Sequence, residues 1–191
     1  MRLPVRCRLL LATAGAAVAL TAGCGAEAAA PASSGPFPPR PTSIDVSRLD
    51  PCSGVTPAEA ERLQLPEPLR RTADVGGAPS PTCSWDGLSE GRYSYAAQFI
   101  PVSAAEAAQD RGSELDVIDG YGAVRGSPAS IHNVENGPAG CQFAVDVADG
   151  YTLRIQVSSG ALRTGNDPKE FRKVCAEARR FASAYLVTVR G

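Results

Sequence analysis

This 191-residue sequence lacks an excess of basic charge and a long apolar run, and it has a single histidine. Nineteen Lys and Arg residues oppose 20 Asp and Glu residues, and the net charge of −1 excludes a polybasic nucleic-acid-binding protein. The apolar run at residues 9–20 is shorter than the roughly 20 residues that a membrane-spanning helix needs. The overall composition, 43% hydrophobic and 20% charged residues, is typical of a folded globular chain.

Sequence motifs for catalysis and metal binding are also missing. The chain has no G-x-S-x-G elbow, no phosphate loop, no Rossmann fingerprint and no cluster of metal ligands. Its single histidine, His132, is the only plausible general base, and an isolated histidine is more often a surface side chain than a catalytic one. We therefore predict a protein that is not an enzyme and that holds no cofactor and no metal.

The N-terminus has the pattern of a secretory signal peptide. Arg2, Arg6 and Arg8 precede the uncharged apolar run. A basic start followed by about 7–15 apolar residues is the usual form of such a signal. This segment has no Arg-Arg pair, which favours general secretion over the twin-arginine route.

The apolar run ends in L-T-A-G-C at residues 20–24, which resembles a bacterial lipobox. In a lipobox the cysteine is acylated and becomes the first residue of the mature protein. Cys24 is therefore predicted to carry diacylglycerol and a second acyl chain such as palmitate, which together give stable anchoring. Thr21 stands where an aliphatic residue is commonest, and ordinary signal cleavage with a secreted product is the alternative.

Three segments follow from these signals: a lipoprotein signal peptide at 1–23, a tether at 24–43 and a globular domain at 44–191. The tether is rich in Pro, Ala and Ser and is predicted to be disordered, since such a composition cannot form a core. Removal of residues 1–23 takes away three arginines and leaves 16 basic and 20 acidic residues, a net charge of −4.

The domain has the patterns of strands framed by helices. Thr56 and Pro57 form a capping box that predicts a short helix to about Leu65, and period-two alternation predicts strands at 82–85 and 93–100. A helix is predicted at 103–111 and short strands near 122–125 and 130–134. The strongest helix begins after Asp167 and has an apolar stripe, with Glu177 expected among the polar positions on its other side. We predict an α+β fold in which an antiparallel sheet of four to six strands packs on this C-terminal helix.

A β-hairpin between residues 141 and 157 is the clearest supersecondary signal. A two-residue turn at 149–150 would place Val145 opposite Arg154 and mix the two faces of the hairpin. A three-residue loop at 148–150 instead pairs Val147 with Tyr151 and Val145 with Leu153. We therefore predict the three-residue loop.

Four cysteines remain after the signal peptide and the lipid site are set aside: Cys52, Cys83, Cys141 and Cys175. Outside the membrane they predict two disulfides, with three possible connectivities. Cys141 lies on the apolar face of its strand and Cys175 on the helix stripe that should cover it, which favours their pairing and leaves Cys52 for Cys83. The alternative, a four-thiolate zinc site, lacks the short spacings that such sites use.

The order of motifs resembles a known family. These motifs are D-P-C-S-G-V-T-P-A-E-A at residues 50–60, C-S-W at 83–85, G-C-Q-F at 140–143 and the late Cys175. The chain is similar over residues 50–188 to actinobacterial lipoproteins that carry a domain of unknown function. The resemblance implies a lipobox, a Pro-rich tether and a four-cysteine domain, and it brings no catalytic residues. Seventeen arginines against two lysines agree with an actinobacterial source.

We therefore expect a lipid-anchored domain on the extracytoplasmic side of the cell membrane, with a non-catalytic binding or accessory role. Its partner is expected to be an envelope protein or a small-molecule ligand, and not a nucleic acid. Trp85 and His132 are possible ligand contacts, although Trp85 is expected mainly to pack with Tyr93 and Tyr95. Two alternatives remain open: an extracytoplasmic hydrolase using His132, and a scaffold or regulatory subunit of a membrane complex.

Overall fold

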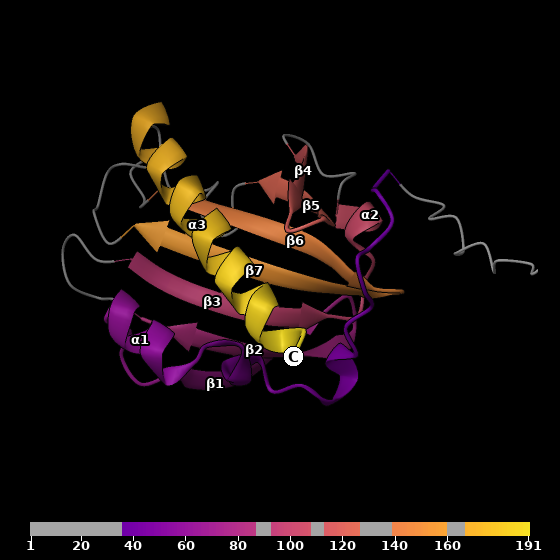
Figure 1. The fold of residues 1–191 in the computed structure, drawn as a ribbon, viewed down its shortest axis with the longest axis horizontal. Helices are drawn as coiled ribbons and strands as arrows, with labels where there is room; N and C mark the ends of the chain where they lie inside the picture. Colours follow the sequence, from indigo (N-terminus) through magenta and orange to yellow (C-terminus); the bar gives the residue numbers. More distant parts are fainter. Residues whose placement is uncertain (1–35, 87–92, 108–112, 127–138, 160–166) are drawn as a thin grey trace, which may run out of the picture. The chain divides into compact units, whose positions relative to one another are not determined.

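Seven strands form one antiparallel sheet in the order β1-β2-β3-β7-β6-β5-β4 (Figure 1). The structure is a computed structural model that describes residues 36–86, 93–107, 113–126, 139–159 and 167–191. The strands are β1 (Leu69–Val75), β2 (Ala78–Trp85), β3 (Tyr93–Ile100), β4 (Glu114–Ile118), β5 (Tyr121–Gly126), β6 (Gly140–Ala148) and β7 (Tyr151–Ser159). The helices are η1 (Val46–Arg48), η2 (Pro51–Gly54), α1 (Pro57–Leu63), α2 (Ala104–Ala107) and α3 (Pro168–Val189). The predicted strand at 130–134 and the end of the predicted helix at 103–111 lie outside the described residues.

The antiparallel α+β architecture agrees with the prediction, but the sheet has seven strands and not four to six. The outermost strands, β1 and β4, were not predicted because they lack a buried alternating face. β2 is also longer than predicted, since it includes Pro79 and Pro81. Both prolines lie in the part of β2 that pairs with β1 alone, where no third strand needs the missing N–H.

The β6–β7 hairpin has a different turn from the predicted one. Val145 pairs with Leu153 as expected, but Tyr151 pairs with Ala148 and not with Val147. A bulge between Asp146 and Ala148 absorbs one residue, so a two-residue turn closes the hairpin while the apolar residues stay on one face. Gly150 takes the positive φ of +71° that this turn requires.

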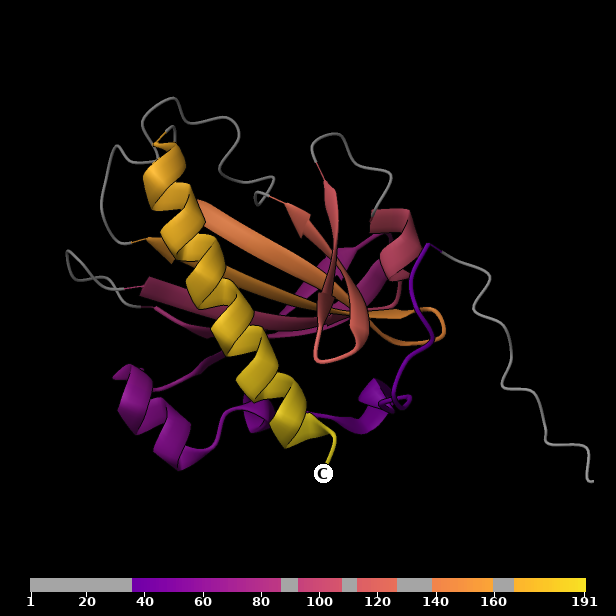
Figure 2. The ribbon, with the colours of Figure 1, turned by 45° about the horizontal axis from the view of Figure 1, so that its top comes forward.

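Helix α3 crosses one face of the sheet over β6 and β7, as Figures 1 and 2 show. Asp167 caps it by accepting the Lys169 N–H at 2.8 Å, and Pro168 occupies the first turn, as the sequence predicts. The buried stripe of the helix consists of Val174, Cys175, Glu177, Ala178, Phe181, Ala182, Tyr185 and Leu186. Tyr185 also donates a 2.7 Å hydrogen bond to the carbonyl of Pro51, which ties η2 to the same core.

The folded unit extends into the segment that the sequence assigns to the tether. Phe37 is buried at 8% exposure beside Gly122, and Arg40 forms ion pairs with Asp146 and Asp149. Ile44 then donates its backbone N–H to Val147 at 2.9 Å. Residues 36–43 therefore lie against the sheet, because one aromatic side chain and one guanidinium find partners there despite the proline-rich composition.

Candidate functional site

Two disulfides cross-link the core on the α3 side of the sheet. Cys52 is bonded to Cys83 and Cys141 to Cys175, which are the two pairs predicted from the sequence. The first joins η2 to β2, and the second joins β6 to α3. All four cysteines are buried, so this face of the sheet is closed by covalent bonds as well as by packing.

Trp85 is part of this closed core. It is 2% exposed, and its ring meets the ring of Phe181 edge-on at a centroid distance of 5.8 Å. It lies across from Tyr95 in the β2–β3 pairing, as expected, but Phe181 from α3 is its ring partner. Because the ring has no open face, we assign Trp85 a packing role and no ligand contact.

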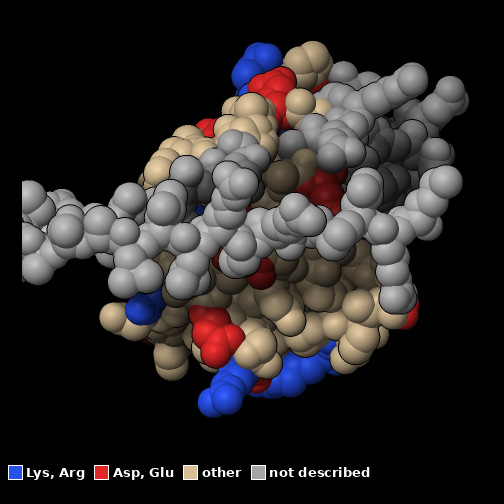
Figure 3. All heavy atoms as spheres, turned by 90° about the vertical axis from the view of Figure 1, so that its right-hand side faces the viewer, with Lys and Arg blue, Asp and Glu red and all other residues tan. Residues whose placement is uncertain are grey.

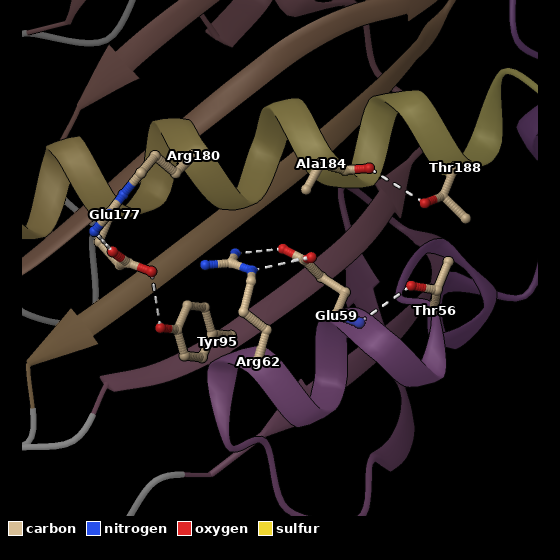
Figure 4. Close-up of polar contacts among 8 residues, drawn as sticks. All are labelled: Thr56, Glu59, Arg62, Tyr95, Glu177, Arg180, Ala184 and Thr188. Carbon is tan, nitrogen blue, oxygen red and sulfur yellow. Dashed lines mark hydrogen bonds and ion pairs between the residues drawn. The ribbon is translucent and has the colours of Figure 1, made fainter.

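A buried carboxylate lies between α3 and β3 (Figure 4). Glu177 is 5% exposed, although the helical pattern places it on the polar side of α3. Tyr95 donates its hydroxyl to Glu177 at 3.0 Å, and Arg180 forms an ion pair with the other carboxylate oxygen. Burial and the charge of Glu177 raise the pKa of the Tyr95 phenol, so the hydroxyl remains a proton donor.

A second ion pair, Glu59 with Arg62 on α1, lies on the side of that helix turned towards α3 (Figure 4). Thr56 caps α1 by accepting the Glu59 N–H at 3.2 Å, as the capping box predicts. The contact between Tyr95 and Glu177 therefore joins β3 to α3, whereas the Glu59–Arg62 pair and the Thr56 cap stabilise α1 itself.

The opposite face of the sheet is polar, and we call it the polar face. It carries the side chains that alternate with the core positions, among them Gln98 of β3, Gln142 and Ala144 of β6, and Thr152, Arg154 and Gln156 of β7. Arg154 stands near its middle, with Gln98 as its partner on one strand and Ala144 on the other.

Part of the polar face is covered by a small apolar cluster. Val124 and Ala144 pack there with Phe37 and with Ala104 of α2, separately from the main core. Helix α2 therefore lies against β5 and β6. The cover lies over Val124 and Ala144, while Gln142 of β6 and Arg154 and Gln156 of β7 remain half-buried.

The acidic group of the polar face already has a counter-ion. Arg40 holds Asp146 at 2.8 Å and also pairs with Asp149. Burial raises the pKa of Asp146, and the charge and hydrogen bond of Arg40 oppose that rise. The carboxylate is thus engaged by the N-terminal segment.

Arg154, in contrast, has no carboxylate partner among the residues that the structure describes. Its Nη2 donates to Oε1 of Gln98, a side chain that is 3% exposed and whose amide nitrogen lies 3.5 Å from the carbonyl oxygen of Ser80. Burial lowers the pKa of Arg154, as expected for a guanidinium that loses water without gaining an anion. A guanidinium nevertheless stays charged at neutral pH, so no described residue neutralises this half-buried cation.

An open groove of about 400 Å³ lies near the edge strand β1, between η2 and β2. Arg70 lines it and is paired with Asp50 at 3.0 Å, and Arg71 lines it as well. Figure 3 shows Lys and Arg side chains gathered along the lower edge, on the side where β1 lies in Figure 1, and acidic side chains nearer the middle. One of the two arginines that line the groove, Arg70, is thus already paired with a carboxylate.

Two of the predicted site residues, Cys24 and His132, lie outside the described residues. Within the described ranges, no group of three or more His, Cys, Asp or Glu side chains is arranged to hold a metal ion. No helix in those same ranges has both the length and the apolar character needed to cross a bilayer. The sequence analysis did not identify Arg154 as a candidate site residue. The only signal available was its place among the polar positions that alternate with the core positions along the second strand of the hairpin.

The fold and the two disulfides define an α+β domain whose sheet is covered by α3 on one face and is polar on the other. The chain belongs to the DUF3558 family, described as a protein of unknown function, which matches residues 19–188. The predicted membership of a family of unknown function is thereby confirmed. No curated protein and no solved structure shows significant similarity to the chain.

Proposed function

We propose that this protein is a lipid-anchored binding domain on the extracytoplasmic side of the cell membrane, of actinobacterial origin, with a non-catalytic role. The observation that carries the binding role is the contrast between the two faces of the sheet. One face is closed by α3 and two disulfides, whereas the other presents a half-buried cation that has no counter-ion among the described residues. A folded domain gains no stability from such a cation, so a ligand is its natural partner.

The proposed location is supported by the sequence signals and by the chemistry of the cysteines. The basic and apolar start leads into the lipobox-like residues 20–24. Disulfides persist in oxidising compartments outside the cytoplasm, and the two in this domain fit that environment. In this proposal residues 1–23 are removed, and the residues between Cys24 and the folded unit connect the lipid to the domain.

Anchoring is tested by replacing the proposed lipid site. Cys24→Ser is expected to move the protein out of the membrane fraction and to remove the acyl mass from its N-terminal peptide, as measured by fractionation and mass spectrometry. Cys7→Ser is the matched control, because Cys7 lies in the segment proposed to be removed, and it should leave the anchored product unchanged. Membrane retention and unchanged mobility of the Cys24→Ser variant would contradict the proposal.

The binding role is tested by cross-linking in intact cells. A domain that binds a small-molecule ligand is expected to give no stoichiometric protein adduct, whereas recovery of one membrane partner at equal amount would favour a scaffold or regulatory subunit instead. Any hydrolytic activity that is found can be tested with His132→Ala. Loss of that activity in the variant would contradict the non-catalytic role.

A further inference from the structure

We propose that the polar face binds a carboxylate with an amide beside it, as at the C-terminus of a peptide, through Arg154 and the glutamines around it. The Arg154 patch consists of Gln98, Gln142, Arg154 and Gln156. This inference rests on the proposed binding function and names the chemistry of its ligand.

The first argument is the unfilled hydrogen-bonding capacity of Arg154. A guanidinium carries five N–H donors in a planar fork, and Gln98 accepts from one nitrogen, Nη2. No other residue in the described part of the chain accepts a hydrogen bond from this side chain. The fork matches the two oxygens of a carboxylate, which can accept two parallel hydrogen bonds.

Gln98 holds the guanidinium in a fixed place, so it is a positioning residue. Its amide nitrogen points to the carbonyl oxygen of Ser80, which leaves its Oε1 for Arg154. Both Gln98 and Ser80 are buried, at 3% and 0% exposure. A side chain held in this way loses less conformational entropy on binding than a free surface arginine.

The nearest acidic side chain in the sheet register does not neutralise Arg154. Asp146 lies one diagonal position away, because it pairs with Thr152 while Arg154 pairs with Ala144. Its carboxylate is bound instead by Arg40. The site therefore has one positive charge to offer, which matches a single carboxylate, while a phosphate dianion would leave a second charge unmatched near Asp146.

The amide part of the proposed ligand follows from Gln142 and Gln156. These side chains pair directly across β6 and β7, on the same face as Arg154 and next to it. Both are half-buried, and neither has a side-chain hydrogen bond to any residue that the structure describes. Each amide offers one acceptor and two donors, which is the complement of a peptide group.

The test is a titration of the full chain, purified in detergent, followed by NMR of the arginine Nε–H and glutamine side-chain amide signals. N-acetylglycine is expected to shift the signals of Arg154, Gln98, Gln142 and Gln156, and N-acetylglycinamide, which lacks the charge, should bind about tenfold more weakly or worse. Binding of inorganic phosphate more tightly than N-acetylglycine would overturn the assignment to a carboxylate. Binding of glucuronate or acetate, which carry no amide, more tightly than N-acetylglycine would overturn the assignment of the amide.

Two variants separate binding from folding. Arg154→Gln is expected to abolish the shifts and to keep the melting temperature, because it removes a half-buried cation, breaks no ion pair and retains an amide N–H that can donate to Gln98. Arg125→Gln is the matched control, since Arg125 lies on the other face of the sheet, is paired with Glu114, and should leave probe binding unchanged. A lower melting temperature for Arg154→Gln than for Arg125→Gln, or unmoved signals in the unmodified protein, would overturn the proposal. Neither result depends on Cys24 or on membrane location, so failure here is distinguishable from failure of the anchoring proposal.

Discussion

The carboxylate of Glu177 is held between α3 and β3 by two partners of different kinds. Arg180 is a largely exposed neighbour three residues along the same helix, whereas Tyr95 is a buried donor from the sheet. A buried charge is costly unless hydrogen bonds replace the water it has lost. The hydroxyl of Tyr95 is therefore the contact that makes the burial of Glu177 tolerable.

Tyr95→Phe removes this donor without changing the packing of the ring. We expect the free energy of unfolding to fall by about 1–3 kcal/mol, the usual cost of a lost hydrogen bond to a charged group. Tyr93→Phe is the control on the same strand, where the hydroxyl has no hydrogen-bond partner among the described residues and a change within about 0.5 kcal/mol is expected. Urea unfolding measures both variants, and equal losses would contradict the role of Tyr95.

Single residues of α3 show why a sequence pattern predicts the burial of some side chains and misses that of others. The apolar stripe of α3 was predicted because helical spacing places its members on one face. Glu177 was expected on the polar side, but it is buried because Tyr95 comes from another strand to meet it. No local pattern contains that contact.

Among the short elements, η2 depends on a titratable cap. Asp50 accepts the Cys52 N–H at 2.9 Å and the Arg70 Nε–H at 3.1 Å. The hydrogen bond from Cys52 and then the contact with Arg70 lower the pKa of Asp50. A lowered carboxyl pKa means that folding favours the ionised form, so this stabilisation is present at neutral pH and is lost as the pH falls below about 4.

Asp50→Asn keeps an oxygen acceptor for the cap but removes the titration. We expect the unmodified protein to be the more stable of the two at pH 7, and the difference in melting temperature to shrink as the pH falls below about 4. Thermal unfolding between pH 3 and 7 measures this difference. A difference that stays constant over the whole range would show that the ionisation of Asp50 does not contribute.

At the scale of the whole molecule, the N-terminal segment and the sheet fold together. Phe37 occupies the space above Gly122, where a Cβ atom would collide with its side chain. Arg40 and Ile44 then bind the β6–β7 hairpin through an ion pair and a backbone hydrogen bond. The segment between the proposed lipid site and the domain is in this way joined to the polar face.

Gly122→Ala is expected to displace Phe37 and to release residues 36–44 from the sheet. The Ile44 amide should then exchange with solvent faster, relative to the Val145 amide in the core, because its bond to Val147 opens more often. Gly126→Ala is the control on the same strand and face, since a Cβ there would meet only Ser113 Oγ at 3.7 Å. Unchanged Ile44 exchange in Gly122→Ala would contradict the docking of the segment.

The sequence by itself determined the elements that depend on neighbours along the chain. It predicted α1 and α3 from caps and periodicity and the β6–β7 hairpin from alternation. It predicted the Cys141–Cys175 disulfide because these cysteines lie on surfaces that must pack together, and Cys52–Cys83 as the pair that remained. Only the tertiary structure decided the edge strands β1 and β4, the bulge beside Asp146, the docking of Phe37 and the burial of Glu177. It also decided that Arg40 pairs with Asp146, so that Arg154 has no anionic partner in the described part of the chain. The contacts of Phe37, Arg40 and Glu177 join residues far apart in sequence, which no local pattern records. The edge strands and the bulge lie in local hairpins, but they lack the regular buried alternation by which a strand is predicted.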